Sequence, residues 1–344
     1  MALKVENEFS GPDTQNVDDS INALDSNTSK RYSVVSLFSG CGGLDLGFKG
    51  GFKFKKANFE RLSTDIVKAY DFDERCGVTY EQNIGPHFEL SDLSKVETST
   101  LSGGQILIGG FPCQEFSSCG PQGGLKSKRG QLYRVLIDYM ATHRPLVVVG
   151  ENVAHLALMN KGKTLETMLK DLNAGEYNFE VWHIFAPDYG IPQTRKRLFF
   201  VGVRKDLKGR PVKPLPEFLG KHRSIEWAIS DLIKVTDESV PNQSEYFKAA
   251  KAINGHGQGD EACIREKPAY TIRANCRSRV QFHYELPRRL TVRECARVQT
   301  FPDAFVFPHS ATSSIRQIGN AVPPVLAHRI AKSILEFLDT QDVQ

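Results

Sequence analysis

A cysteine and a glutamate stand in settings that favour chemistry over packing. Cys113 follows a proline inside the glycine-bounded stretch GGFPCQEFSS, and Glu151 follows the apolar run LVVVG. Cysteine reacts as its thiolate, which nearby cations and exposed backbone amides favour. Cys113 could be a nucleophile, a metal ligand or a packing residue. The chain has no C-x-x-C pair, and the spacing to Cys119 suits no familiar zinc site, so we expect no metal. The loop setting favours a nucleophile over a packing cysteine.

The elements that must position these residues alternate between apolar strands and helical stretches. The expected strands are YSVVSLFSG, IVKAYDFDE, QILIGG, LVVVGEN, FEVWHIFA and RLFFVGV. Buried strands that alternate with helices predict a doubly wound, mostly parallel α/β sheet. Near the end of the chain, two prolines open an amphipathic helix whose apolar positions share one face: Val325, Leu326, Ile330, Ile334, Leu335 and Leu338.

Composition and charge limit the class of protein. The chain has 344 residues, 40% of them hydrophobic, and no apolar run approaches the roughly 20 residues of a membrane helix. The start lacks a secretory pattern, and the odd number of cysteines, 7, shows no disulfide framework, so we expect a cytoplasmic protein. The net charge is only +4, but Lys and Arg are concentrated in residues 204–223 and 265–297. Such runs are either solvated faces or a surface that follows phosphates.

Shifts in composition predict four parts. Residues 1–31 are polar and lack periodicity, as in a mobile tail, and residues 32–203 hold the expected sheet. Residues 204–314 are basic and rich in Pro and Gly, so we expect a second, smaller domain with a bracing segment. Residues 315–344 return to the sheet domain.

Polar residues follow the expected strands at the edge where an open α/β sheet binds ligands. The turn FSGCGGLDLGF fails the dinucleotide fingerprint, because the third glycine of G-x-G-x-x-G would fall on Asp45, whose charge would repel a pyrophosphate. A cofactor without phosphates fits better, and a turn without any ligand is the alternative. Asp71 or Asp73 could bind a ribose, Phe72 could cover an adenine and Asp92 could meet its amino group. This nucleoside pocket suits S-adenosylmethionine as easily as NAD.

A cysteine nucleophile beside S-adenosylmethionine suggests chemistry on cytosine. Carbon 5 of cytosine is too electron-poor to attack a methyl donor, but addition of a thiolate to carbon 6 makes carbon 5 nucleophilic. The addition needs a donor at ring nitrogen 3. Glu151 could supply it, because an apolar, partly closed pocket can raise the pKa of a glutamate. A solvated acid at a strand end is the alternative for this residue.

The whole chain resembles a known family. Over residues 33–337 it is similar to the DNA (cytosine-5) methyltransferases of bacterial restriction-modification systems, whose fold is an S-adenosylmethionine-dependent methyltransferase sheet with a smaller target-recognition domain. The resemblance rests on six blocks in the family's order: LFSGCGGLDLGF, GGFPCQEFS, ENV, QTRKRLFFVG, RRLTVRECARVQTFPD and QIGNAVPP.

The resemblance implies a role for each matching residue. Cys113 is the nucleophile, Glu151 holds ring nitrogen 3 and the exocyclic amine, and Arg195 and Arg197 hold the flipped nucleotide. Gln317 is a structural brace. The contacts to S-adenosylmethionine fall on Phe38, Gly40, Gly42, Gly43, Asp71, Phe72, Asp92, Pro112, Asn320 and Val322. The stretch before Asp71 is longer than the family norm, so Asp73 stays an alternative ribose ligand.

The implied substrate is double-stranded DNA, from which the target base must be swung out. Arg129, at the end of the glycine-rich loop after Cys113, is expected to contact DNA. Candidates for reading bases in the major groove are Arg273, Asn275, Arg277 and Arg279, and contact with phosphate alone is the alternative. We expect a monomer that works beside a restriction endonuclease.

Three alternative functions would each require a different feature in the same blocks of sequence. A tRNA cytosine methyltransferase would carry the Cys-Phe-Thr signature of those relatives, which this chain lacks. An inactive DNA-binding relative would have a broken Pro-Cys, Glu-Asn or arginine block, and all three are intact. An NAD oxidoreductase would need the glycine fingerprint that the first turn lacks.

Overall fold

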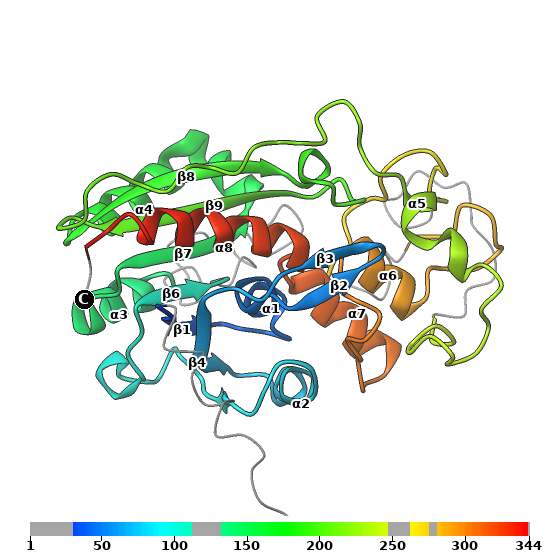
Figure 1. Cartoon of the computed structure of the whole chain (residues 1–344), viewed down its shortest axis with the longest axis horizontal. Coiled ribbons are helices and arrows are strands. Elements are labelled where there is room, and N and C mark those ends of the chain that lie inside the picture. Colours follow the sequence, from blue (N-terminus) through cyan, green and yellow to red (C-terminus); the bar gives the residue numbers. More distant parts are fainter. Residues whose placement is uncertain (1–29, 112–131, 247–261, 275–280, 343–344) are drawn as a thin grey trace, which may run out of the picture. The chain divides into compact units, whose positions relative to one another are not determined.

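A seven-stranded sheet lies at the centre of residues 31–344, which form one compact unit of the chain (Figure 1). The structure is a computed structural model, and it describes residues 30–111, 132–246, 262–274 and 281–342. The strand order is β5-β4-β1-β6-β7-β9-β8, and β9 is the one strand that runs opposite in direction to the rest. The strands are β1 (Tyr32–Leu37), β4 (Thr64–Asp71), β5 (Phe88–Leu90), β6 (Ile106–Gly109), β7 (Val147–Val153), β8 (Tyr177–Phe185) and β9 (Lys196–Arg204).

Helices cover both faces of this sheet, as a doubly wound fold requires. One face shares a core with α1, α2 and α8, and the other with α3 and α4. The helices are α1 (Gly43–Lys49), α2 (Glu74–Asn83), α3 (Arg134–His143), α4 (Lys163–Asn173), α5 (Ile225–Ile229), α6 (Val292–Val298), α7 (Ala311–Asn320) and α8 (Pro324–Leu338). Short 3-10 helices are η1 (Thr98–Thr100), η3 (Ala154–Ala157), η4 (Met159–Gly162), η5 (Ala186–Tyr189) and η6 (Ser230–Leu232).

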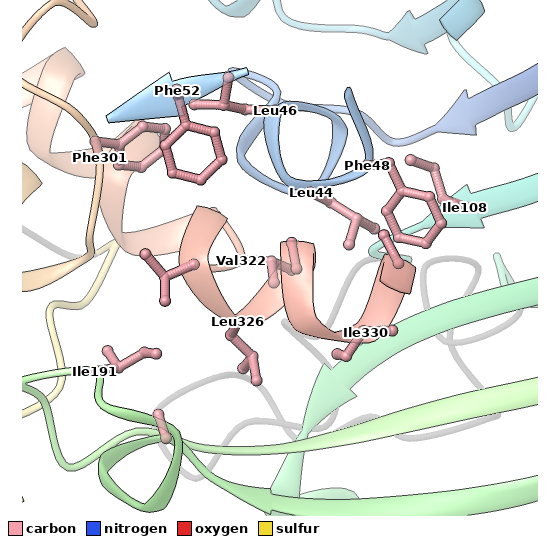
Figure 2. Packing of buried hydrophobic residues seen from close by; sticks show 14 of the residues in the cluster. Leu44, Leu46, Phe48, Phe52, Ile108, Ile191, Phe301, Val322, Leu326 and Ile330 are labelled. Carbon is pink, nitrogen blue, oxygen red and sulfur yellow. The ribbon is translucent and has the colours of Figure 1, made fainter. Parts of the chain in front are cut away.

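The C-terminal helix α8 packs against α1 (Figure 2). A Cβ atom at Gly47 would lie 2.2 Å from the Cβ of Ala327, so only glycine permits this approach of the two helices. Leu44 of α1 and Leu326 and Ile330 of α8 belong to the same buried core. The predicted apolar face of α8 is confirmed, because all six of its positions are buried.

A hairpin that the sequence analysis did not predict occupies the long stretch between the first turn and β4. It consists of β2 (Phe52–Phe54) and β3 (Ala57–Phe59). Phe54 meets the ring of Trp227 at 6.0 Å, and the Lys55 ammonium lies 2.8 Å from the Asp231 carboxylate. Asp231 also pairs with Arg297 of α6, at 2.7 Å. The hairpin therefore joins the sheet domain to the segment around α5 and α6.

The division of the chain into four parts stays a prediction. Residues 31–344 form one compact unit, and the boundary expected near residue 204 is not tested by it. Within the described ranges, no helix is long and apolar enough to cross a membrane.

Candidate active site

The turn after β1 begins the candidate cofactor site. Phe38, Gly40 and Gly42 have positive φ angles of 57°, 54° and 84°. The turn is closed by hydrogen bonds from Ser39 N to Tyr70 O and from Gly42 N to Ser39 O, each 3.0 Å long. A left-handed backbone costs a residue such as phenylalanine about 1–3 kcal/mol. The surrounding structure therefore holds Phe38, half-buried, at the edge of the sheet.

Neighbouring glycines of this turn have different surroundings. A Cβ atom at Gly42 would lie 2.1 Å from Cδ1 of Ile84, and one at Gly43 would lie 2.4 Å from the carbonyl oxygen of Val322. At Gly40, no other described residue comes within 4 Å of that position. The turn is closely packed against α2 and the C-terminal segment but open at Gly40, as a ligand cradle requires.

The two candidate ribose ligands have different partners in the structure. The Asp71 carboxylate ends β4 and accepts hydrogen bonds from Gly40 N at 2.9 Å and Asp73 N at 3.0 Å. Burial raises the pKa of Asp71. The Asp73 carboxylate instead caps α2 by accepting from Arg75 N at 3.0 Å. Of the two, Asp71 is therefore the one beside the glycine turn, and Phe72 next to it is 69% exposed.

Asp92 lies after β5, which is the neighbour of β4 in the sheet. Ser91 N donates to Asp71 O at 2.7 Å, which places this segment beside the end of β4. Hydrogen bonds from Lys95 and Ser94 hold the pKa of Asp92 near 2. An ionised carboxylate therefore stands at this corner as an acceptor for a ligand's amino group.

The end of α7 and the residues that connect it to α8 close the same side of the glycine turn. The Val322 side chain is buried and Asn320 is exposed. The Gln317 amide donates to the carbonyl of Arg75 at 3.2 Å, and the Cys41 thiol donates to the carbonyl of Gln317 at 3.7 Å. These contacts fit the bracing role expected of Gln317.

A buried ion pair marks the second part of the site. Glu151, 7% exposed in β7, lies with Oε1 2.7 Å from Nε of Arg197 in β9. The antiparallel pairing of the two strands aligns Val153 with Arg197 and brings the side chains together. Glu151 is buried as expected, but a guanidinium stands beside it, so its surroundings are not simply apolar.

The segment that leads to Cys113 is anchored beside Glu151. The Asn152 side chain donates to the carbonyl of Phe111 at 3.2 Å. A Cβ atom at Gly110 would lie 3.6 Å from Oε2 of Glu151. Gly110 and Phe111, the last described residues before Cys113 in the sequence, therefore lie close to Glu151.

Arg195 is placed differently from what the resemblance implies. Its side chain is 1% exposed. Its guanidinium donates to three carbonyl oxygens, those of Gly319 at 3.1 Å, Ala321 at 3.0 Å and Ile272 at 3.4 Å. The Arg195 guanidinium therefore points into the protein interior, whereas the Arg197 guanidinium contacts the Glu151 carboxylate.

Several expected residues lie outside the described part of the chain: Pro112, Cys113, Arg129, Asn275, Arg277 and Arg279. Of the expected DNA-reading residues, Arg273 is described. A Cβ atom at Gly319 would lie 2.4 Å from the carbonyl carbon of Arg273, so the backbone at Arg273 lies directly against the end of α7.

Two buried glutamines near Arg195 were not singled out from the sequence. Gln193 accepts a hydrogen bond from Ile272 N at 3.0 Å and donates to Gln299. Gln299 donates to the carbonyl of Ala321. Gln193 opens the block QTRKRLFFVG and Gln299 lies within RRLTVRECARVQTFPD, so their places in these blocks were the only sequence signal for their role.

The sheet order and the glycine turn beside an acidic strand end are those of the S-adenosylmethionine-dependent methyltransferase class. Among the described residues, no group of three His, Cys, Asp or Glu side chains could hold a metal ion.

Comparison with known proteins specifies the family. A family model described as C-5 cytosine-specific DNA methylase matches residues 32–256 and 242–336. The type II methyltransferase M.NgoFVII of Neisseria gonorrhoeae is 33% identical, over 90% of this chain and 87% of its own. M.DsaV of Dactylococcopsis salina is 31% identical, over 92% and 89%. The structure of the Entamoeba histolytica methyltransferase EhMeth has the same fold, with a TM-score of 0.67 and 14% identity over 90% of this chain and 99% of that one.

The chain therefore belongs to the C-5 cytosine-specific DNA methylase family. Its activity is that of a DNA cytosine-5 methyltransferase, with relatives of the type II restriction-modification kind. The predictions of family, fold class and reaction are confirmed.

Proposed function

We propose that the chain methylates carbon 5 of a cytosine that is flipped out of a short, specific duplex DNA site, with Cys113 as nucleophile. The observation that supports this most directly is that the candidate cofactor site and the site around Glu151 lie side by side at the carboxyl ends of the parallel strands. The glycine turn and Asp71 follow β1 and β4, while Phe111 and Glu151 lie at the ends of β6 and β7. The strand order reverses between β1 and β6, where open α/β sheets bind ligands.

The residues at the first of these sites fit S-adenosylmethionine. The open space at Gly40 leaves room for the cofactor. The Asp71 carboxylate has acceptor capacity left for ribose hydroxyls. Exposed Phe72 offers an adenine a ring face. The full set proposed to hold the cofactor is Phe38, Gly40, Gly42, Gly43, Asp71, Phe72, Asp92, Pro112, Asn320 and Val322. The bound cofactor supplies an electrophilic methyl group.

At the second site, protein groups activate the base. The Cys113 thiolate adds to carbon 6 of cytosine, and carbon 5 becomes nucleophilic. Glu151 binds ring nitrogen 3 and the exocyclic amine, where charge develops during the addition. Arg197 holds the Glu151 carboxylate in this orientation through their 2.7 Å contact. Once carbon 5 carries the methyl group, its proton is removed and the thiolate leaves.

The remaining parts of the proposal concern DNA and cellular context. Arg129 contacts DNA from the loop after Cys113, and residues 204–284 read the target in the major groove, with Arg273, Asn275, Arg277 and Arg279 as candidate readers. The protein acts as a monomer in the cytoplasm and protects DNA from a restriction endonuclease of the same specificity.

Transfer of a labelled methyl group tests this proposal. Wild type and Cys113→Ser are given unmethylated duplex DNA or tRNA, and the modified DNA is sequenced for 5-methylcytosine. We expect label in DNA at one short motif, and none with Cys113→Ser. Label in tRNA alone, or full activity of Cys113→Ser, would contradict it. Cleavage of the modified DNA by endonucleases specific for that motif then tests the protective role.

A further inference from the structure

The buried guanidinium of Arg195 binds backbone carbonyls from two different parts of the chain. Gly319 lies in the last turn of α7 and Ala321 directly follows that helix, whereas Ile272 belongs to the expected recognition segment. A buried guanidinium is destabilising unless hydrogen bonds compensate for its lost hydration. The three hydrogen bonds therefore fix the positions of these carbonyls, and of the two segments that carry them, around the guanidinium.

On one side, Arg195 fixes the segment that closes the cofactor cradle. The carbonyl of Val322 lies against Gly43, and a Cβ atom at Gly43 would be 2.9 Å from the Ala321 side chain. Any shift of residues 319–322 would therefore change the contact with the glycine turn.

On the other side, Arg195 and its neighbours fix the recognition segment. Thr194 N donates to Ala269 O at 2.8 Å, and Ala269 N donates to Pro192 O at 2.9 Å. Gln193 accepts from Ile272 N at 3.0 Å. Residues 192–195 and 269–272 are thus joined by one parallel bridge, between Gln193 and Ala269, and by hydrogen bonds from Ile272 to the Gln193 side chain and from the Arg195 guanidinium to Ile272.

We propose that Arg195 is a positioning residue that locks the recognition segment, residues 269–273, to the cofactor segment, residues 319–322. Arg197, two residues further along, is then the one arginine of this block that faces the nucleotide. The inference rests on the proposed function, because it takes these segments to serve DNA and S-adenosylmethionine. It predicts that Arg195 affects cofactor binding even when no DNA is present.

The discriminating measurement is the affinity for S-adenosylhomocysteine, the demethylated product, in the absence of DNA. Arg195→Lys keeps the charge but loses the fork that spans Gly319 and Ala321. We expect its affinity to fall roughly tenfold or more, as for the loss of hydrogen bonds to a charged group. Arg197→Lys is the matched control and should bind the product as wild type does. Unchanged product binding by Arg195→Lys would overturn the inference.

Steady-state kinetics on DNA provide a second readout. Arg195→Lys should raise KM for both the cofactor and DNA with a smaller change in kcat, whereas Arg197→Lys should mainly lower kcat. A loss of kcat alone in Arg195→Lys would assign Arg195 to the nucleotide and overturn the inference.

Gln299→Leu repeats the test without altering a buried charge, should Arg195→Lys fail to fold. It removes the second donor to the Ala321 carbonyl, so product affinity should fall in the same direction but less. Unchanged affinity would contradict the inference. Failure of the proposed function would look different, because wild type itself would then bind no product or methylate no DNA.

Discussion

The Arg197 guanidinium lies 2.7 Å from the Glu151 carboxylate, and both side chains are almost fully buried at the edge of the sheet. The two residues come from strands that are antiparallel neighbours, β9 and β7. The contact fixes the direction of a carboxylate that is proposed to bind the edge of the base. A flexible surface acid would lose conformational entropy on binding the base, and Glu151 has already lost most of that freedom.

Replacement of Glu151 by glutamine should therefore impair catalysis more than folding. Glu151→Gln keeps the size of the side chain but changes its hydrogen bonding to the base and removes the charge that faces Arg197. We expect methyl transfer to slow by about 100-fold or more, the usual contribution of a positioned acid or base. Single-turnover assays with saturating DNA measure this. Glu166→Gln, on the exposed side of α4, is the control and should be fully active. Wild-type rates for Glu151→Gln would exclude the proposed role.

Two glycines of the first turn should respond differently to alanine. At Gly42 the added Cβ would overlap Ile84 and Tyr80, so Gly42→Ala should destabilise the fold by more than about 2 kcal/mol. At Gly40 the space is open, so Gly40→Ala should cost only about 1 kcal/mol of backbone strain. Because that Cβ would enter the proposed cradle, Gly40→Ala should nevertheless weaken product binding. Urea unfolding and calorimetry separate the two effects, and tight product binding by Gly40→Ala would place the cofactor elsewhere.

Asp45 in α1 predicts a specific dependence of stability on pH. Burial raises its pKa to about 6, although the Tyr80 hydroxyl donates to Oδ1 at 3.0 Å. The folded protein therefore keeps this proton to a higher pH than the unfolded chain, whose aspartates have a pKa near 3.9. The contribution of Asp45 to the free energy of unfolding must then fall between about pH 4 and pH 6, by on the order of 2–3 kcal/mol.

Asp45→Asn should remove that part of the pH dependence. The variant should match wild type near pH 4 and exceed its stability above pH 6. Urea unfolding at both pH values, compared between the two proteins, measures the difference. Parallel pH profiles of wild type and variant would contradict the assignment.

The β2–β3 hairpin should stabilise the protein through its buried rings. Phe54 is 4% exposed and packs against Trp227, so Phe54→Ala should lower the free energy of unfolding by about 3–5 kcal/mol. Val67→Ala, at a 42% exposed position of β4, should change it by less than about 0.5 kcal/mol. If both variants changed the free energy of unfolding by the same small amount, the hairpin would not contribute to stability as predicted.

The sequence predicted the sheet because its strands are continuous apolar runs that end in glycine or polar residues. It did not predict the hairpin, since FKF and ANF are too short to be told from loop by periodicity. Their pairing depends on packing against Trp227 and His328, which lie far away in the chain.

Candidate site residues could be predicted from the sequence where chemistry and strand ends coincide, as at Glu151 and at the pair Asp71 and Asp73. The burial of Arg195 did not, because arginine in a polar block is usually exposed. Its partners are backbone carbonyls, which carry no sequence signal. Likewise, Asp71 and Asp73 are distinguished only by their hydrogen bonds, with Gly40 and Arg75 respectively, and the sequence does not reveal these.

A covalent complex with DNA is the most direct test of the central claim, that the Cys113 thiolate adds to carbon 6 of the target cytosine. Duplex DNA with 5-fluorocytosine at the methylated position is incubated with protein and S-adenosylmethionine. Fluorine at carbon 5 leaves no proton to remove, so the thiolate should stay attached. We predict a denaturation-resistant protein–DNA complex whose cross-linked peptide contains Cys113, and no complex with Cys113→Ser. A complex that persists in Cys113→Ser, or none with a wild type that methylates the same site in ordinary DNA, would contradict the account.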